Sequence, residues 1–220
     1  MNKNLTALIL GIGLLSLSSC SGNKKETTAT QEQQPVSTSS NSRTSPIDLE
    51  GSTLLWKGFK PAGEHYGSIA LSDGQIELHE DKLVSGFVEV DMGSIKVTDL
   101  EGEMAEKLKA HLEGEDFFDV TQHPKARFEL TDLPEEGLPL LGLTEIKGNL
   151  TLKGIVKNIS IPIEDVLMDQ STQKYQIRSK KFLIDRSEWN VRYGSKKFFD
   201  NLADKFINDE IELQFVLSTR

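Results

Sequence analysis

The feature that most constrains the fold is an alternation of apolar and polar side chains with a period of two. It recurs along the chain beyond residue 50 and is clearest near the C-terminus, where the apolar positions are Ile211, Leu213, Phe215 and Leu217. Residues 126–131 show the same pattern, since Ala126, Phe128 and Leu130 alternate with polar side chains. Such alternation is typical of a strand that buries one face and exposes the other. The pattern therefore predicts a protein built mainly of β-strands.

Further segments bring the count to about eight strands. They lie at residues 69–71, 76–78, 83–92, 146–152, 159–163 and 175–177. Two short segments that contain glycine predict hairpin turns, because glycine tolerates the backbone angles that tight turns need. They are Ser72-Asp73-Gly74 and Lys153-Gly154. Strands joined by such turns form an antiparallel sheet.

Two segments depart from the strand pattern. Met104, Leu108 and Leu112 recur every four residues, which predicts a short amphipathic helix. Residues 195–206 predict a second helical or irregular excursion, in which Phe198 and Phe199 share an apolar side with other residues. Two short helices are too few for the repeated crossovers of a parallel sheet. We therefore expect an all-β fold, either a sandwich or, as we prefer, a closed antiparallel β-barrel with one or two short helices.

The N-terminus predicts export and a lipid anchor. Residues 1–19 combine Lys3 with an apolar run that is too short for a stable membrane span, which is typical of a signal peptide. Leu17-Ser18-Ser19-Cys20 matches a bacterial lipobox, in which the cysteine carries diacylglycerol. The alternative is an ordinary signal peptide with an incidental or free cysteine. Cys20 is the single cysteine, so the chain forms no internal disulfide.

Composition divides the rest of the chain into a tether and a domain. Residues 21–45 are rich in Ser, Thr, Gln, Asn and Lys, with few apolar side chains to offset the entropy of ordering them. We therefore expect residues 20–48 to form a lipidated, flexible tether and residues 49–220 to form one domain. The lipid would place the protein in the cell envelope. Ser21 follows Cys20 where inner-membrane retention expects an acidic residue, which favours the outer membrane facing the periplasm.

Charge restricts the partners. The net charge of −9 makes nucleic acid an unsuitable partner. One stretch is basic against this acidic background, and it contains Arg178, Lys180, Lys181, Arg186, Arg192, Lys196 and Lys197. Most such stretches are solvated faces. The alternative is a basic rim that meets a polar headgroup or an anionic membrane surface.

The most specific motif runs from the predicted helix into the strand at Phe128. It reads His111-Leu112-Glu113-Gly114-Glu115-Asp116-Phe117-Phe118-Asp119-Val120, followed by His123-Pro124-Lys125-Ala126-Arg127-Phe128. This block resembles the signature of the YceI-like proteins, which are lipocalin-like barrels that bind polyisoprenoid lipids. The resemblance continues in order from about Ser52 to Leu217. Its segments are Trp56-Lys57-Gly58, residues 65–69, residues 87–95, residues 146–154 and residues 182–189.

The resemblance implies a ligand in the barrel interior. Alternation alone does not decide between an interior filled by side chains and one that holds a ligand. In the YceI-like family the barrel encloses the extended tail of a polyisoprenoid or isoprenoid quinone, for carriage, storage or protection against stress. The inward-facing candidates are Phe87, Phe128, Leu130, Ile146, Leu150, Leu152, Ile159, Ile161, Ile177, Leu213 and Phe215. Trp56, Tyr66 and Trp189 are candidates for the rim, although a buried structural role is equally compatible with Trp56.

The sequence offers little support for an enzyme. His65, His79, His111 and His123 are not paired at the short spacings of zinc ligands, and no cysteine accompanies them. No nucleophile elbow, phosphate-binding loop or dinucleotide fingerprint occurs in a fitting context. We therefore expect a binding protein without metal or cofactor, whose partners are an isoprenoid lipid, a membrane and, in a homodimer, a second copy. The alternative is a lipid-anchored interaction module with a packed core.

Overall fold

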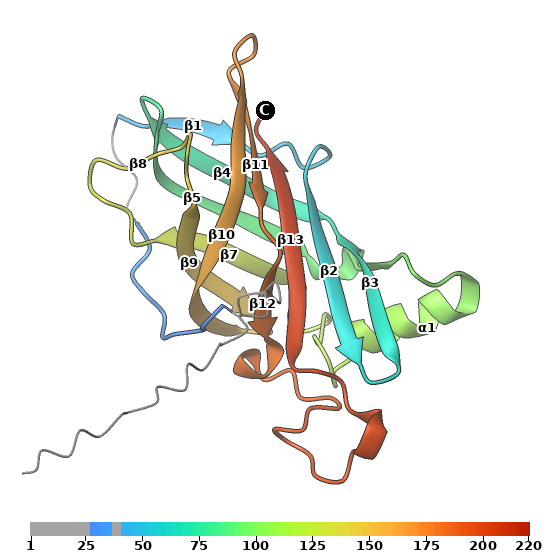
Figure 1. Cartoon of the computed structure of the whole chain (residues 1–220). Helices are drawn as coiled ribbons and strands as arrows, with labels where there is room; N and C mark the ends of the chain where they lie inside the picture. The colour runs from blue at the N-terminus through green and yellow to red at the C-terminus, as the bar shows by residue number, and fades with distance from the viewer. Residues whose placement is uncertain (1–26, 37–40) are drawn as a thin grey trace, which may run out of the picture.

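The fold is a single antiparallel sheet of thirteen strands that curls into a half-barrel, with one α-helix at its side (Figure 1). The computed structural model describes residues 27–36 and 41–220, and the counts here refer to them. The strands are β1 Arg43–Pro46, β2 Thr53–Lys60, β3 Gly63–Ile69, β4 Leu71–His79, β5 Lys82–Asp91, β6 Lys96–Val97, β7 Lys125–Thr131, β8 Leu138–Pro139, β9 Glu145–Leu152, β10 Ile155–Asp169, β11 Lys174–Ser179, β12 Phe182–Asp185 and β13 Glu210–Ser218. The helix is α1 Gly102–Glu113, and short 3₁₀ turns are η1 Met92–Ser94, η2 Arg186–Trp189 and η3 Ala203–Lys205.

This architecture confirms the predicted all-β, lipocalin-like fold with a helix. The predicted strand number is too low, because short strands such as β6 and β8 carry too few residues to show a period of two. The sheet has the order β1-β4-β5-β7-β9-β10-β11-β13-β2-β3-β6, while β12 pairs with β13 and β8 with β5. Strands that are distant in the sequence therefore face one another across a shared interior.

The predicted hairpin at Lys153-Gly154 is confirmed. Leu152 of β9 pairs with Ile155 of β10, so these two residues form the whole turn. Both have positive φ, 48° at Lys153 and 73° at Gly154. A two-residue turn with positive φ at both positions matches the twist of the strands it joins. This turn fixes the register of the two strands.

The predicted turn at Ser72-Asp73-Gly74 is wrong, because these residues lie within β4. β4 pairs with β5, and the register shifts between Leu71 and Asp73. The Gly74 N–H donates to Asp73 Oδ1 over 2.8 Å. The Asp-Gly pair therefore serves a bulge, the other local structure in which such residues are common. The hairpin itself closes at residues 80–81, between His79 and Lys82.

Residues 102–113 form the predicted helix, and its burial changes along its length. Leu112 is buried and Leu108 half-buried, whereas Met104 is exposed. Only the C-terminal part of α1 therefore packs against the core. Residues 195–206 form an irregular segment that contains η3, and Phe198 and Phe199 are exposed rather than gathered on one buried apolar side.

Residues 27–36 form a strap across the outer face of the barrel, which we call the N-terminal strap. It passes over Thr131, Asn149 and Asn158, which alternate along β7, β9 and β10 with inward-facing apolar residues. The Gln33 N–H donates to Asn149 Oδ1 over 3.0 Å, and Asn149 Nδ2 donates to the Gln33 carbonyl over 2.7 Å. Asn158 Nδ2 in turn donates to Thr131 Oγ1 over 2.8 Å.

The flexible tether predicted for residues 20–48 is therefore wrong over its described part. Besides the N-terminal strap, residues 43–46 form β1, which pairs with β4. The segment has the polar composition of an unstructured chain. It is nevertheless ordered, because its backbone N–H and C=O groups form hydrogen bonds with the sheet edge and with asparagine side chains. The predicted signal peptide and the lipidation site at Cys20 lie outside the described residues.

Candidate ligand-binding cavity

The curled sheet encloses a cavity whose wall surface is almost entirely apolar. Its volume is about 190 Å³, and thirty-six residues from all around the sheet line it. Alternate residues of β13 contribute to the wall from Ile211 to Leu217, a rise of about 20 Å along the strand. A small volume spread over such a length describes a narrow, elongated space. It suits a chain-like apolar ligand better than a broad one.

Most of the residues predicted from the sequence meet at this cavity. Those in its lining are Trp56, Phe87, Phe128, Leu130, Ile146, Leu150, Leu152, Ile159, Ile161, Ile177, Leu213 and Phe215. They come from β2, β5, β7, β9, β10, β11 and β13, so the prediction brought together residues from seven strands. Contact between these side chains and a ligand stays a prediction.

Phe87 is the inward-facing candidate whose direction is wrong. On β5 the paired residue Val88 faces Phe128, which points into the core, so the neighbouring Phe87 points outward. The Arg127 guanidinium lies 3.7 Å from the centre of the Phe87 ring, on the same outer face. Phe87 thus belongs to the residues that line the cavity, but its ring packs on the outer face against a charge. Because Phe87 and Val88 are adjacent and both apolar, the sequence pattern does not show which of them faces inward. The structure places the larger one, Phe87, on the outer face.

Two of the three rim candidates lie away from the cavity. Tyr66 is exposed on the outer face of β3, where it pairs with Lys57. Trp189 is fully buried at the end of η2, and its Nε1 donates to the Leu150 carbonyl over 2.9 Å. Its indole N–H thus has a backbone partner inside the protein and does not need the contact with water that a position at the rim would provide. Trp56 is the rim candidate that reaches the cavity.

Sequence reasoning missed a second group of lining residues. They include Leu54, Ile76, Leu83, Val90, Met92, Ile95, Leu112, Phe117, Phe118, Phe182 and Ile184. Several belong to strands whose alternation is visible in the sequence, so counting every apolar position of the same phase would have found them. Phe117 and Phe118 belong to the block after α1. Their rings stand edge to face, 4.9 Å apart, and form part of the wall there.

A glycine shapes the wall beside Phe128. A Cβ atom at Gly148 would lie 2.7 Å from Phe128 Cε2 and 2.6 Å from the Glu129 carbonyl oxygen. Any larger residue at this position would have to displace the aromatic ring. Gly148 therefore allows the Phe128 ring to lie flat against β9, so that it lines the cavity without filling it.

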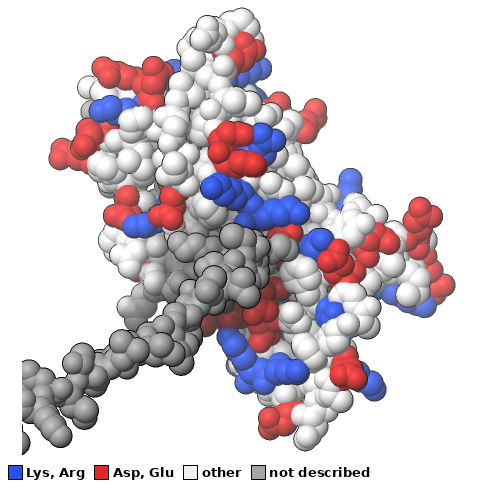
Figure 2. All heavy atoms as spheres, in the orientation of Figure 1, with Lys and Arg blue, Asp and Glu red and all other residues white. Residues whose placement is uncertain are grey.

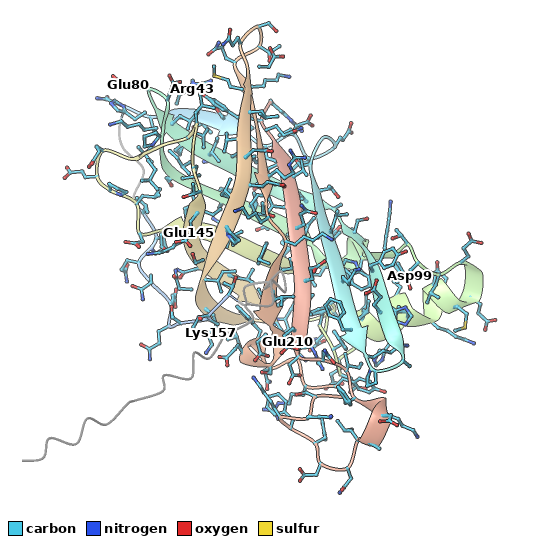
Figure 3. The ribbon with its side chains drawn as sticks, viewed as in Figure 1. Arg43, Glu80, Asp99, Glu145, Lys157 and Glu210 are labelled. Atoms are coloured by element: carbon cyan, nitrogen blue, oxygen red, sulfur yellow. The ribbon has the colours of Figure 1, made fainter. Side chains whose placement is uncertain are left out.

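A buried arginine defines one end of the cavity, which we call the Glu210 end. Figure 3 labels Glu210 and Lys157 at this end of the barrel, and Arg43 and Glu80 at the other. Arg186 lines the cavity with a fully buried side chain. Its Nη1 donates to the Val191 carbonyl over 2.9 Å, its Nη2 to the Ile207 carbonyl over 3.1 Å, and its Nε to the Asn208 carbonyl over 3.1 Å. Arg186 thereby joins the two ends of the segment that follows it.

Arg186 remains a charged group in this surrounding. Burial lowers the pKa of Arg186 from its ordinary value, although nearby acidic groups, Asp209 first among them, oppose the shift. Arg186 Nη2 lies 3.4 Å from Asp209 Oδ1, which supplies the compensating negative charge. Its planar group can satisfy several carbonyl acceptors at once, a geometry that lysine lacks.

The sequence of this domain matches a known protein family. A family model described as YceI-like domain matches residues 46–219, which is most of the chain. The chain belongs to the YceI-like family. This confirms the resemblance carried by the sequence motifs, and the match begins at Pro46, within β1.

Solved structures agree with the YceI-like fold. The crystal structure of BcnA from Burkholderia cenocepacia has a TM-score of 0.60 at 20% identity, covering 79% of this chain and 99% of that one. A polyisoprenoid-binding domain from Saccharophagus degradans, implicated in plant cell wall breakdown, has a TM-score of 0.53 at 12% identity, covering 80% and 97%. At these identities the likeness concerns the fold.

Curated relatives match over a shorter region. A UPF0312 protein of Photorhabdus laumondii is 30% identical over 99 residues, which are 45% of this chain and 47% of the relative. A UPF0312 protein of Pectobacterium carotovorum is 32% identical over 96 residues, 44% and 46% of the two chains. The match thus spans about half the length of these relatives.

The structure gives a physical role to the YceI-like segment Asp185-Arg186-Ser187. Asp185 Oδ1 accepts hydrogen bonds from the Ser187 N–H over 2.9 Å and from Ser187 Oγ over 2.6 Å, which caps η2. Lys197 also pairs with Asp185. Burial acts to raise the pKa of Asp185, but the hydrogen bonds from Lys197 and Ser187 outweigh it, and the pKa lies below its ordinary value. This segment therefore builds the Glu210 end of the cavity.

Within residues 27–36 and 41–220, no group of three or more His, Cys, Asp or Glu side chains is arranged to hold a metal ion. In the same part of the chain, no helix has both the length and the apolar character needed to cross a bilayer.

Proposed function

We propose that this YceI-like protein binds the tail of a polyisoprenoid or isoprenoid quinone in its cavity, for carriage, storage or protection against stress in the cell envelope. The observation that carries the proposal is the long, narrow and almost wholly apolar cavity. The wall presents almost no polar surface to a charged ligand, whereas burying an apolar tail contributes roughly 0.8 kcal/mol per CH₂ group. The polyisoprenoid-binding domain of Saccharophagus degradans, which shares the fold, supports the choice of ligand.

A second candidate function is a lipid-anchored interaction module with a packed core. The observation that favours it is the volume of about 190 Å³, below the roughly 300–1,000 Å³ typical of ligand pockets. Under the first proposal the barrel widens, or the ligand leaves part of its tail outside. Under the second it stays closed. A binding experiment therefore separates the two functions.

Trp56 provides the reporter for this experiment. We expect an isoprenoid quinone to quench the tryptophan fluorescence of the full chain saturably, because Trp56 lines the cavity and a quinone in contact with an indole quenches it by electron transfer. Trp189, which is fully buried outside the cavity lining, should contribute a constant background. In Trp56→Phe most of the saturable change should disappear. A quinone without the tail should bind at least about 100-fold more weakly. Equal affinities for the two quinones, or no saturable quenching, would favour the interaction module.

We further propose that Cys20 carries a lipid that holds the domain at the outer membrane, facing the periplasm. The lipobox at residues 17–20 supports this placement. Replacing Cys20 with Ala should move the protein from the membrane fraction to the soluble fraction, provided that the signal peptide is still removed. Immunoblots of fractionated cells measure the distribution, and Ser21→Ala is the matched control. Unchanged membrane retention of a processed Cys20→Ala protein would contradict the anchor.

A further inference from the structure

The segment that follows Arg186 projects from the Glu210 end of the barrel, and we call residues 190–209 the 190–209 lobe (Figure 1). Its last residues line the cavity through Ile207 and Asn208. The three hydrogen bonds from Arg186 fix both ends of the lobe, and the Ile207 N–H donates to the Gly194 carbonyl over 2.8 Å. The lobe is therefore a defined structure placed at one end of the cavity.

Three aromatic side chains of this lobe are open to solvent. The exposed fractions are 44% for Tyr193, 40% for Phe198 and 48% for Phe199. The other large exposed apolar residues among the described ones are scattered over β2, β3, α1, β10 and the loop at residue 141. Single exposed apolar residues are ordinary, whereas several exposed aromatic residues on one small lobe are typical of a surface that meets another apolar phase. Aromatic rings of this kind favour the interface between water and lipid.

Basic side chains lie among these rings. The Arg192 guanidinium lies 4.9 Å from the centre of the Phe198 ring, and Lys196 Nζ lies 3.4 Å from the centre of the Phe206 ring. The lobe holds four basic residues against three acidic ones, and one of these, Asp209, pairs with the buried Arg186. Its charge is thus opposite in sign to the −9 of the whole chain. In Figure 2 the lobe lies at the bottom of the view, where both blue and red atoms lie among uncharged white ones.

The N-terminal segment reaches the barrel near the same end. The Thr27 N–H donates to the Leu183 carbonyl over 2.8 Å, and Leu183 stands three residues before Arg186, at the base of the lobe. Thr27 follows Cys20 by seven positions, and a chain of that length spans at most about 25 Å. A lipid on Cys20 would therefore keep this end of the barrel close to the membrane surface.

We propose that the 190–209 lobe docks the protein on an anionic phospholipid surface, with Phe198 and Phe199 among the headgroups and Arg192 and Lys196 facing lipid phosphates. Docking would bring the Glu210 end of the cavity against the bilayer, which is where an isoprenoid tail resides. An apolar tail then passes between bilayer and cavity without crossing water. The transfer step rests on the proposed function, whereas docking requires only the lobe and the membrane. A basic and aromatic surface of this kind combines two sources of membrane affinity.

Hydrogen exchange on the full chain tests the docking. The protein is reconstituted into vesicles of phosphatidylethanolamine and phosphatidylglycerol, into vesicles of phosphatidylcholine alone, or kept in a non-ionic detergent. In the anionic vesicles we expect amides of residues 192–206 to exchange about fivefold more slowly than in detergent, with a smaller effect on phosphatidylcholine. The turn at residues 170–173, at the far end of β10, should exchange at the same rate in all three.

Matched variants separate docking from folding and from ligand binding. The double variant Phe198→Ser with Phe199→Ser should lose the protection, and Leu167→Ser, an exposed apolar residue of β10, should keep it. Circular dichroism checks that both variants still fold, whether or not the protein binds a quinone. Equal exchange of residues 192–206 in vesicles and detergent would overturn the proposal, and so would equal protection at residues 170–173. Protection of the lobe in a protein that binds no quinone would retain docking and reject the proposed function alone.

Discussion

Replacing Arg186 with Leu is expected to lower the free energy of unfolding by about 3–5 kcal/mol, because it removes one partner of a buried network. The carbonyls of Val191, Ile207 and Asn208 would lose their donor, and Asp209 would lose its positive partner. Each buried polar group that is left without a partner costs about 1–3 kcal/mol. Urea denaturation followed by circular dichroism measures the change, with a constant denaturant slope as the sign that both proteins unfold in the same way.

Two other variants make this result specific. Arg192→Leu changes an exposed arginine of the same lobe and should alter the free energy of unfolding by no more than about 0.5 kcal/mol. Arg186→Lys keeps the charge but replaces the planar group by a single ammonium, so we expect a loss between those of the other two variants. If Arg186→Leu were as stable as the parent protein, the hydrogen bonds to the lobe would not hold it in place.

Filling the cavity is expected to abolish ligand binding while the fold persists. Leu152 and Ile161 are buried residues of β9 and β10 that line the cavity. A Trp at either position adds a large ring to a space of about 190 Å³, so the tail and the ring compete for the same volume. We expect at least about a 100-fold loss of quinone affinity, together with a destabilisation of about 1–3 kcal/mol from overpacking. Trp56 quenching and thermal unfolding measure the two effects.

Phe87→Trp is the matched control for the cavity variants. It introduces the same side chain on the same sheet, but on the outer face, where the Arg127 guanidinium covers the ring. Its quinone affinity should remain that of the parent protein. If Leu152→Trp and Ile161→Trp bound quinone as well as Phe87→Trp does, the cavity would not be the binding site.

The fold was predictable from the sequence wherever alternation and turn chemistry agreed. The β9–β10 hairpin, β7 and β13 follow directly from the period of two, because each buries one face. The hairpin turn predicted at the Asp-Gly pair of β4 was wrong because the same residues favour both a turn and a bulge. The pairing of β4 with β5 decides between the two. The N-terminal strap was missed because its order comes from Asn149 and Asn158, which are more than a hundred residues away.

The sequence predicted many of the residues that line the cavity, but it did not predict the volume that they enclose. Alternation placed residues of β7, β9, β10, β11 and β13 on one face, yet the volume between them depends on how far the sheet curls, which no local pattern encodes. The alternation gave the wrong direction for Phe87, because Phe87 and Val88 are both apolar and the pattern fits the strand with either of them facing inward. Trp189 was misplaced because its indole N–H finds the Leu150 carbonyl inside the protein. Arg186 lies in a recognised motif, but its role depends on residues 207–209, which the fold brings back beside it.

The most direct test of the account is native mass spectrometry, with lipid extraction, on the full chain purified from the bacterium that makes it. The account predicts a discrete added mass that is released on extraction and identified as a polyisoprenoid or an isoprenoid quinone. In the Leu152→Trp protein this mass should be absent, while any lipid on Cys20 should remain because it is covalent. A homogeneous protein without added mass, unchanged after incubation with isoprenoid quinones, would contradict the account and leave the interaction module in its place.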